Sequence, residues 1–332
     1  MALPEPIEPG DVVLTRATGW VSRAICLVDD SEVSHAALAL DADTLAETVG
    51  SGLRTVTFEQ ALDEHDLAVG RTLTTPADMS PVLQVARDYL ARPVSYAHQQ
   101  IVLLAVLCTT RRVPLPPGGR RMVRTVLDQA ACAVNAMAER GRQPMICSEF
   151  VARCHSEARP CEPYVLKIGD DEAAAEGRTL LEWAHSHPGL PHLPVPEAAA
   201  GAFDPAGAEK ALAPLVSAYA TAVGRTDFLP LGHALPVSAP PAEPGESELL
   251  ASMTAFGNAL HRATRPQEHR GPVPPDEALE QIRAMAAAPD FVTPGDLLRT
   301  ASLTEHFRLA VPVPGRAAGT PGTPLGSLLR RR

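Results

Sequence analysis

The sequence predicts an α+β fold, and three observations support this prediction. Short segments rich in β-branched and aliphatic residues, separated by Gly, Pro and Asp, fill residues 10–57 and predict strands. Longer segments with apolar residues three and four positions apart follow them and predict helices. The chain of 332 residues is 45% hydrophobic but only 4% aromatic, so its core is expected to consist mainly of Ala, Leu and Val.

The N-terminal part of the chain predicts the sheet. Residues 10–15 are β-branched and follow a Pro-Gly turn, which favours a strand. Trp20, Ala24 and Leu27 share one face of a helix. The elements predicted here are a strand at 10–15, a helix at 20–28, a strand at 33–40, a hairpin of 44–49 and 53–57, and a helical turn at 58–62.

Four helices are predicted in the middle of the chain. Pro81 stands at the start of the first, where its missing N–H is not needed. Gly141 ends the third, because glycine tolerates the backbone that closes a helix. These helices span 81–90, 97–112, 121–140 and 147–158.

The composition changes after residue 162. Stretches rich in Pro, Gly and Ala alternate with helical patches at 208–223, 246–263 and 276–288. A helix with one apolar stripe needs a partner surface, so these patches are expected to pack on the preceding core. The expected division is a catalytic core at 1–162, a helical and loop-rich extension at 163–290, a returning strand segment at 291–313, and a disordered tail at 314–332.

The charge and the cysteines exclude several classes of protein. The net charge of −10 argues against a nucleic-acid partner. The N-terminal residues lack the basic and apolar regions of a secretory signal, so we expect none. The longest apolar run, Ile101–Cys108, is far shorter than the roughly 20 residues of a membrane-spanning helix. The six cysteines include no Cys-x-x-Cys pair, so reduced thiols are expected, with no metal and no cofactor. We expect a cytoplasmic protein and leave peripheral membrane contact open.

A cysteine and a histidine are the candidates for chemistry. Cys147 lies at the predicted start of a helix, where the helix dipole lowers the pKa of a thiol and backbone N–H groups can bind an oxyanion. His35 lies at the entry of the predicted strand 33–40, between small residues, and can serve as a general base. The alternatives are a buried cysteine in an apolar helix and a hydrogen-bonded core histidine.

Four segments occur in a recognisable order over residues 9–158. They are Pro9-Gly10-Asp11-Val12-Val13-Leu14, Ser34-His35-Ala36-Ala37-Leu38, Ala46-Glu47-Thr48 and Ile146-Cys147-Ser148-Glu149-Phe150-Val151. This set resembles the circularly permuted branch of the NlpC/P60 papain-like superfamily, which includes YiiX-like hydrolases and lecithin–retinol acyltransferase-like enzymes. Most papain-type enzymes place the cysteine before the histidine, whereas here the histidine comes first. The resemblance implies an antiparallel sheet accompanied by the helix that carries the nucleophile.

The resemblance also implies a role for each matching residue. Cys147 would be the nucleophile, His35 the base, and Glu47 the group that orients His35, with a solvent-facing strand glutamate as the alternative for Glu47. Tyr96, Ser34 and Ser148 are candidate contacts to the oxyanion or the substrate. The family often has a glycine before a Tyr-Asp pair, and this chain departs from that with Arg92-Pro93-Val94-Ser95-Tyr96-Ala97.

The expected activity is that of a cysteine-dependent hydrolase or acyltransferase. It would cleave an amide or an ester through a thioester, and the resemblance favours a lipid or N-acyl substrate. One alternative is an intracellular peptidase or amidase acting on peptide-like substrates, and another is a binding module without catalysis. The use of Arg in place of Lys, with abundant Ala and Pro, is typical of a high-GC bacterial genome.

Overall fold

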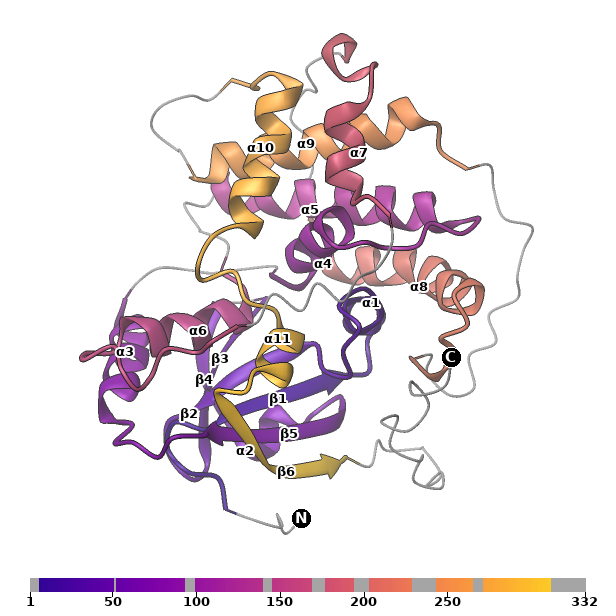
Figure 1. The fold of residues 1–332 in the computed structure, drawn as a ribbon. Coiled ribbons are helices and arrows are strands. Elements are labelled where there is room, and N and C mark those ends of the chain that lie inside the picture. The colour runs from indigo at the N-terminus through magenta and orange to yellow at the C-terminus, as the bar shows by residue number, and fades with distance from the viewer. Residues whose placement is uncertain are drawn as a thin grey trace.

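The computed structural model describes residues 6–50, 52–92, 99–139, 145–168, 177–193, 203–228, 243–264 and 271–311. These residues form helices and one antiparallel sheet, which confirms the α+β prediction (Figure 1). Tyr96 and the tail expected at 314–332 lie outside the described residues.

The sheet has six strands in the order β4-β3-β2-β1-β5-β6, and every neighbouring pair is antiparallel. The strands are β1 (Val12–Ala17), β2 (His35–Ala39), β3 (Thr44–Val49), β4 (Gly52–Thr57), β5 (His65–Leu73) and β6 (Leu303–Ala310). The predicted hairpin is confirmed, because β3 and β4 pair around the glycine turn. The last strand joins the sheet from the far end of the chain, and it pairs with β5 at the edge.

Strand β5 was not predicted from the sequence. Asp66 and Arg71 interrupt the apolar pattern that usually indicates a buried strand, yet both side chains are buried. Asp66 is paired with two arginines, accepting from Arg16 Nε at 2.7 Å and from Arg23 Nη2 at 2.5 Å. Buried charges are tolerated when they are paired in this way, so the strand forms despite its polar residues.

Helices cover both faces of the sheet. The nucleophile-candidate helix α6 (Cys147–Glu157) and helix α3 (Ser80–Ala91) share one apolar cluster with a sheet face, in which Phe150 packs near Leu14 and Leu38. The short helix α2 (Phe58–Ala61) lies on the opposite face, beside Leu45 and Phe307. The sheet therefore has helices on both faces, and the first residue of α6 lies against it.

A second body of helices lies next to the sheet (Figure 1). Its members are α1 (Trp20–Val28), α4 (Gln99–Thr110), α5 (Gly119–Glu139), α7 (Leu180–Ser186), α8 (Pro205–Ala222), α9 (Glu246–Thr264) and α10 (Pro275–Ala286). Their buried residues form a single apolar cluster, with the Ile101–Cys108 run at its centre. This cluster joins helices from before and after residue 162. The expected division of the chain at 162 stays a prediction.

The segment predicted as a returning strand begins with a helix. Helix α11 (Pro294–Arg299) starts at Thr293, whose hydroxyl accepts from the Asp296 N–H, while the Asp296 carboxylate accepts from the Thr293 N–H. This reciprocal cap stabilises a short helix where the Pro-Gly-Asp sequence alone resembles a turn before a strand. The strand follows it as β6, in which Phe307 fills the space left by Gly70 of β5.

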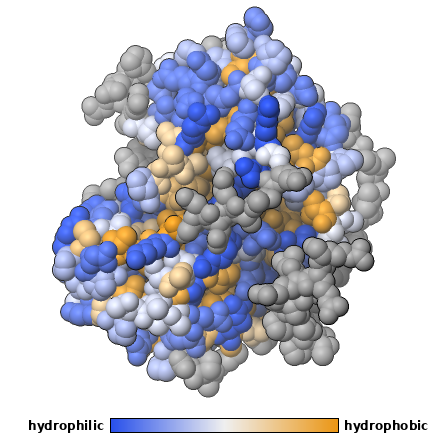
Figure 2. Space-filling model, in the orientation of Figure 1, coloured by the Kyte–Doolittle hydropathy of each residue, from blue (hydrophilic) through white to orange (hydrophobic). Residues whose placement is uncertain are grey.

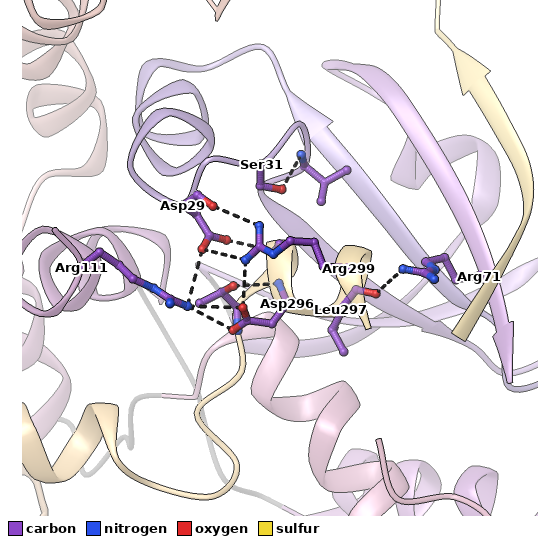
Figure 3. A network of polar contacts seen from close by, with 10 residues as sticks. Asp29, Ser31, Arg71, Arg111, Asp296, Leu297 and Arg299 are labelled. Atoms are coloured by element: carbon purple, nitrogen blue, oxygen red, sulfur yellow. Dashed lines mark hydrogen bonds and ion pairs between the residues drawn. The ribbon is translucent and has the colours of Figure 1, made fainter. Parts of the chain in front are cut away.

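A polar network connects α11 to both bodies (Figure 3). The buried Asp29, at the end of α1, accepts from the Gly295 N–H at 3.0 Å. Arg299 and Arg111 lie between Asp29 and Asp296, and Arg299 Nη2 donates to Asp296 Oδ1 at 2.9 Å. Burial and the nearby Asp296 raise the pKa of Asp29 to about 6, although Arg299 opposes this.

Arg71 of β5 holds the other side of α11. Its Nη1 donates to the Leu297 carbonyl at 3.0 Å, and its Nη2 donates to the Thr300 carbonyl at 3.0 Å and to the Leu303 carbonyl. These carbonyls lie at and just beyond the end of the helix, where intrahelical partners run out. Helix α11 is thus fixed to the sheet at one end and to α1 and α4 at the other.

The surface drawn in Figure 2 is mostly hydrophilic, with smaller hydrophobic areas between. Among the described residues, the large hydrophobic side chains that are exposed are Leu115 and Val165. No helix in the described ranges combines the length and the apolar character needed to cross a membrane.

The network around Asp29 makes stability depend on pH. The folded pKa of about 6 lies above the ordinary value of 3.8, so the folded state binds this proton more tightly and Asp29 stabilises the fold less as pH rises from 4 to 7. In Asp29→Asn this dependence is absent. We expect the free energy of unfolding of the native protein, relative to Asp29→Asn, to fall by about 2 kcal/mol between pH 4.5 and 7.5. Urea titrations at both pH values measure this, and parallel behaviour of the two proteins would contradict it.

Candidate active site

Cys147 is the first residue of helix α6 and lies almost fully inside the protein. The Ile146 N–H, at the N-cap, donates to Glu149 Oε2 at 3.1 Å, which fixes the start of the helix. The sulfur accepts from the backbone N–H groups of Ser148 and of Ala36 on strand β2. A thiol in this position lies at the positive end of the helix dipole and among donors that favour the thiolate.

His35 is the first residue of β2, and its ring connects Cys147 with Glu47. Its Nε2 lies 2.8 Å from Glu47 Oε2. A carboxylate only accepts, so Nε2 carries the proton of this hydrogen bond and Nδ1 is the nitrogen left for the thiol. A hydrogen bond also connects His35 with Cys147. The structure thus brings together the three residues for which the resemblance implied a triad.

The charged forms of His35 and Cys147 stabilise each other. Burial alone would lower the pKa of His35, but the adjacent Cys147 thiolate and Glu47 raise it to about 10. Burial alone would raise the pKa of Cys147, but the His35 charge, the hydrogen bond to His35 and the two backbone N–H groups lower it. Both shifts favour the pair of a thiolate and an imidazolium, which is the reactive form of a cysteine nucleophile.

Glu47 lies on β3, next to β2 in the sheet. Ala37 is the residue opposite Glu47, so His35 is its diagonal neighbour. On its other side Glu47 faces Arg54 of β4, whose Nε and Nη2 donate to Oε1 at 3.0 and 2.8 Å. Burial opposes ionisation of Glu47, but the bonds to His35 and Arg54 lower its pKa to about 2. Glu47 is a buried carboxylate and not the solvent-facing glutamate considered as the alternative.

A pocket of about 1370 Å³ reaches His35 and Glu47. Arg54, Asp43 and Asp63 contribute charge to its wall, while Phe58 and Leu309 are among its apolar residues. Cys147 is not among the described residues that line it. The pocket therefore approaches the candidate site from the side of the base and its carboxylate.

The tentative substrate contacts have different surroundings. Ser34 is fully buried, and its hydroxyl is 2.5 Å from that of Ser22 on α1, which turns it away from the pocket. Ser148 has no hydrogen-bond partner for its hydroxyl among the described residues, while its backbone N–H reaches the Cys147 sulfur. Tyr96 lies outside the described residues. The roles of all three stay predictions.

Sequence analysis did not identify Arg54 or His65 as part of this site. Arg54 was detectable, because residues equally distant from the centre of a tight hairpin face each other, as Glu47 and Arg54 do. The ring centroids of His65 and His35 lie 6.4 Å apart, and His65 also lines the pocket. His65 begins the strand that was not predicted, so no pattern pointed to it.

The other buried cysteines have surroundings of a different kind. Burial raises the pKa of Cys26 and of Cys108 to about 12. Burial also raises the pKa of Cys154, which lies two turns further along α6. The described residues contain no cluster of three or more side chains suited to hold a metal ion.

Comparison with known proteins gives one informative match. The chain is similar to the protein named "Probable lipoprotein peptidase YaeF" of Escherichia coli (strain K12), with 25% identity over 205 residues, which is 55% of this chain and 72% of that protein. No family model matches the chain, and no solved structure matches it significantly. The similarity to a protein named as a peptidase suggests a hydrolase role.

The thiol of Cys147 should react fastest with iodoacetamide at pH 6. Its pKa is lowered, whereas the pKa values of Cys26, Cys108 and Cys154 are raised. Peptide mass spectrometry after a short pulse measures the order of labelling. The exposed Cys161 is the control for simple access, and Cys161→Ser should leave the fast phase unchanged while Cys147→Ala removes it. Fast labelling of Cys26 or Cys108 would contradict the assignment.

The variant Glu47→Gln should keep the fold but weaken the site. An amide can hold the ring of His35 but cannot stabilise its positive charge, so turnover should fall roughly 10- to 100-fold, less than in Cys147→Ala. Initial rates on a thiol-hydrolase substrate, alongside circular dichroism, check this. Equal turnover in Glu47→Gln and the native protein would assign the orienting role to another residue.

Proposed function

We propose that the protein is a thiol hydrolase that uses Cys147 as nucleophile, His35 as general base and acid, and Glu47 as the orienting carboxylate. The observation that carries this proposal is the continuous set of contacts from Cys147 through His35 to Glu47 at the start of a helix. A structural cysteine needs neither a lowered pKa nor an imidazole partner. The similarity to a protein named as a peptidase agrees with this chemistry.

The reaction follows from the protonation states. The Cys147 thiolate attacks the carbonyl carbon, and backbone N–H groups at the start of α6 stabilise the oxyanion. His35 donates its proton to the leaving amine or alcohol as the tetrahedral intermediate collapses to a thioester. His35 then takes a proton from water, which attacks the thioester and releases the acid and the thiolate. Glu47 keeps Nε2 protonated throughout, so Nδ1 remains available for transfer.

The pocket favours a peptide-like amide over a lipid acyl chain. Its wall includes apolar side chains such as Phe58 and the solvent-exposed carboxylates of Asp43 and Glu59. A site for an acyl chain would be a continuous apolar channel, and these carboxylates interrupt such a surface. The related protein's name also refers to a peptidase. We therefore place the peptidase or amidase reaction ahead of the lipid or N-acyl reaction.

Matched substrates test the proposal. Three compounds are incubated with the native protein and with Cys147→Ala: a peptide amide and a simple ester that share one short acyl group, and an amide whose acyl group is a long chain. Acid-quenched mass spectrometry should show the acyl group on Cys147, and the peptide amide should give the highest kcat/KM. No adduct and no turnover with all three would favour a binding module on this fold. Preference for the long-chain compound would favour the lipid reaction.

A further inference from the structure

We propose that Arg54 is a positioning residue of this site, which holds Glu47 in the orientation in which Glu47 supports His35. This inference rests on the thiol-hydrolase function proposed above. It concerns how the site keeps its carboxylate ionised and correctly turned.

The two oxygens of Glu47 are divided between two partners. Oε1 accepts both donors of Arg54, from Nε at 3.0 Å and from Nη2 at 2.8 Å, and Oε2 lies 2.8 Å from His35 Nε2. Rotation of the carboxylate would break both sets of contacts together. Arg54 therefore determines which oxygen faces His35 and at what angle.

The burial of the two residues differs in a way that supports this role. The Glu47 side chain is 4% exposed, whereas the Arg54 side chain is 51% exposed and lies on the wall of the pocket. A buried carboxylate tends to take up a proton unless a cation compensates it. Arg54 supplies that cation from the solvent side, directly across the β3–β4 pair.

A second interpretation of Arg54 predicts the opposite shift in the pH at which the Cys147 thiolate forms. If Arg54 acted only as a positive charge near His35, its removal would make the imidazolium more favourable and the thiolate easier to form. If Arg54 acts through Glu47, its removal frees the carboxylate to turn or to take a proton. The His35 imidazolium then loses the stabilising charge of Glu47, and the Cys147 thiolate forms only at higher pH. The direction of the shift separates the two readings.

The experiment measures the rate of iodoacetamide alkylation of Cys147 against pH, in the full chain. The variants are Arg54→Ala and Arg54→Lys, and Lys keeps the charge but cannot make the two-pronged contact. The matched control is Arg308→Ala on β6. Arg308 also donates to one glutamate, Glu305, through Nε and Nη2, but it lies away from the site. This readout needs no substrate.

For Arg54→Ala we expect the acid limb of the profile to move up by about one pH unit and the rate at pH 6 to fall about tenfold. Arg54→Lys should lie between Arg54→Ala and the native protein, and Arg308→Ala should match the native protein. The double variant Arg54→Ala/Glu47→Gln should match Glu47→Gln alone, because both changes act through one carboxylate.

Two results would overturn the inference while leaving the proposed function standing. One is an unchanged profile in both Arg54 variants, and the other is a shift of the acid limb to lower pH. If Arg54→Ala does not fold by circular dichroism, Arg54→Lys alone decides between these outcomes. Failure of the proposed function looks different, since Cys147 would then not be the fastest thiol in the native protein.

Discussion

The hydrogen bond between His35 and Glu47 is the interaction on which the arrangement of the site depends. It is a buried contact between two ionisable groups, and such a contact is favourable only when every remaining polar atom is satisfied. Cys147 and the backbone N–H groups satisfy one end, and Arg54 satisfies the other. The neighbouring strands β2, β3 and β4 and the start of α6 must therefore be in register for the charges to balance.

Buried charged groups with polar partners also occur where the sheet and the second body of helices meet. Asp29 is buried between arginines at the junction of α1, α4 and α11, and Arg71 holds the carbonyls at the end of α11 (Figure 3). Apolar packing supplies most of the area buried inside each body, but it has no directional preference. The charged contacts at α11 have fixed geometry, so they define how the C-terminal segment is seated between the sheet and the helices.

The elements best predicted from the sequence are those determined by local patterns. Helix Trp20–Val28 and the β3–β4 hairpin follow from spacing and from a glycine turn, and the start of α6 at Cys147 follows from residues that favour a first turn. Strand β5 could not be predicted in this way. Asp66 and Arg71 are acceptable inside a strand only because distant arginines and carbonyls satisfy them, and sequence periodicity carries no information about such partners.

The pairing of β5 with β6 has a consequence for biosynthesis. About 230 residues separate the end of β5 from the start of β6, so a ribosome adding roughly 5–20 residues each second needs tens of seconds to supply the missing partner. During that time β5 presents unpaired N–H and C=O groups at the sheet edge, which is a template for pairing with other chains. The free edge of β5 is therefore an aggregation hazard that persists until the C-terminal segment emerges and pairs with it.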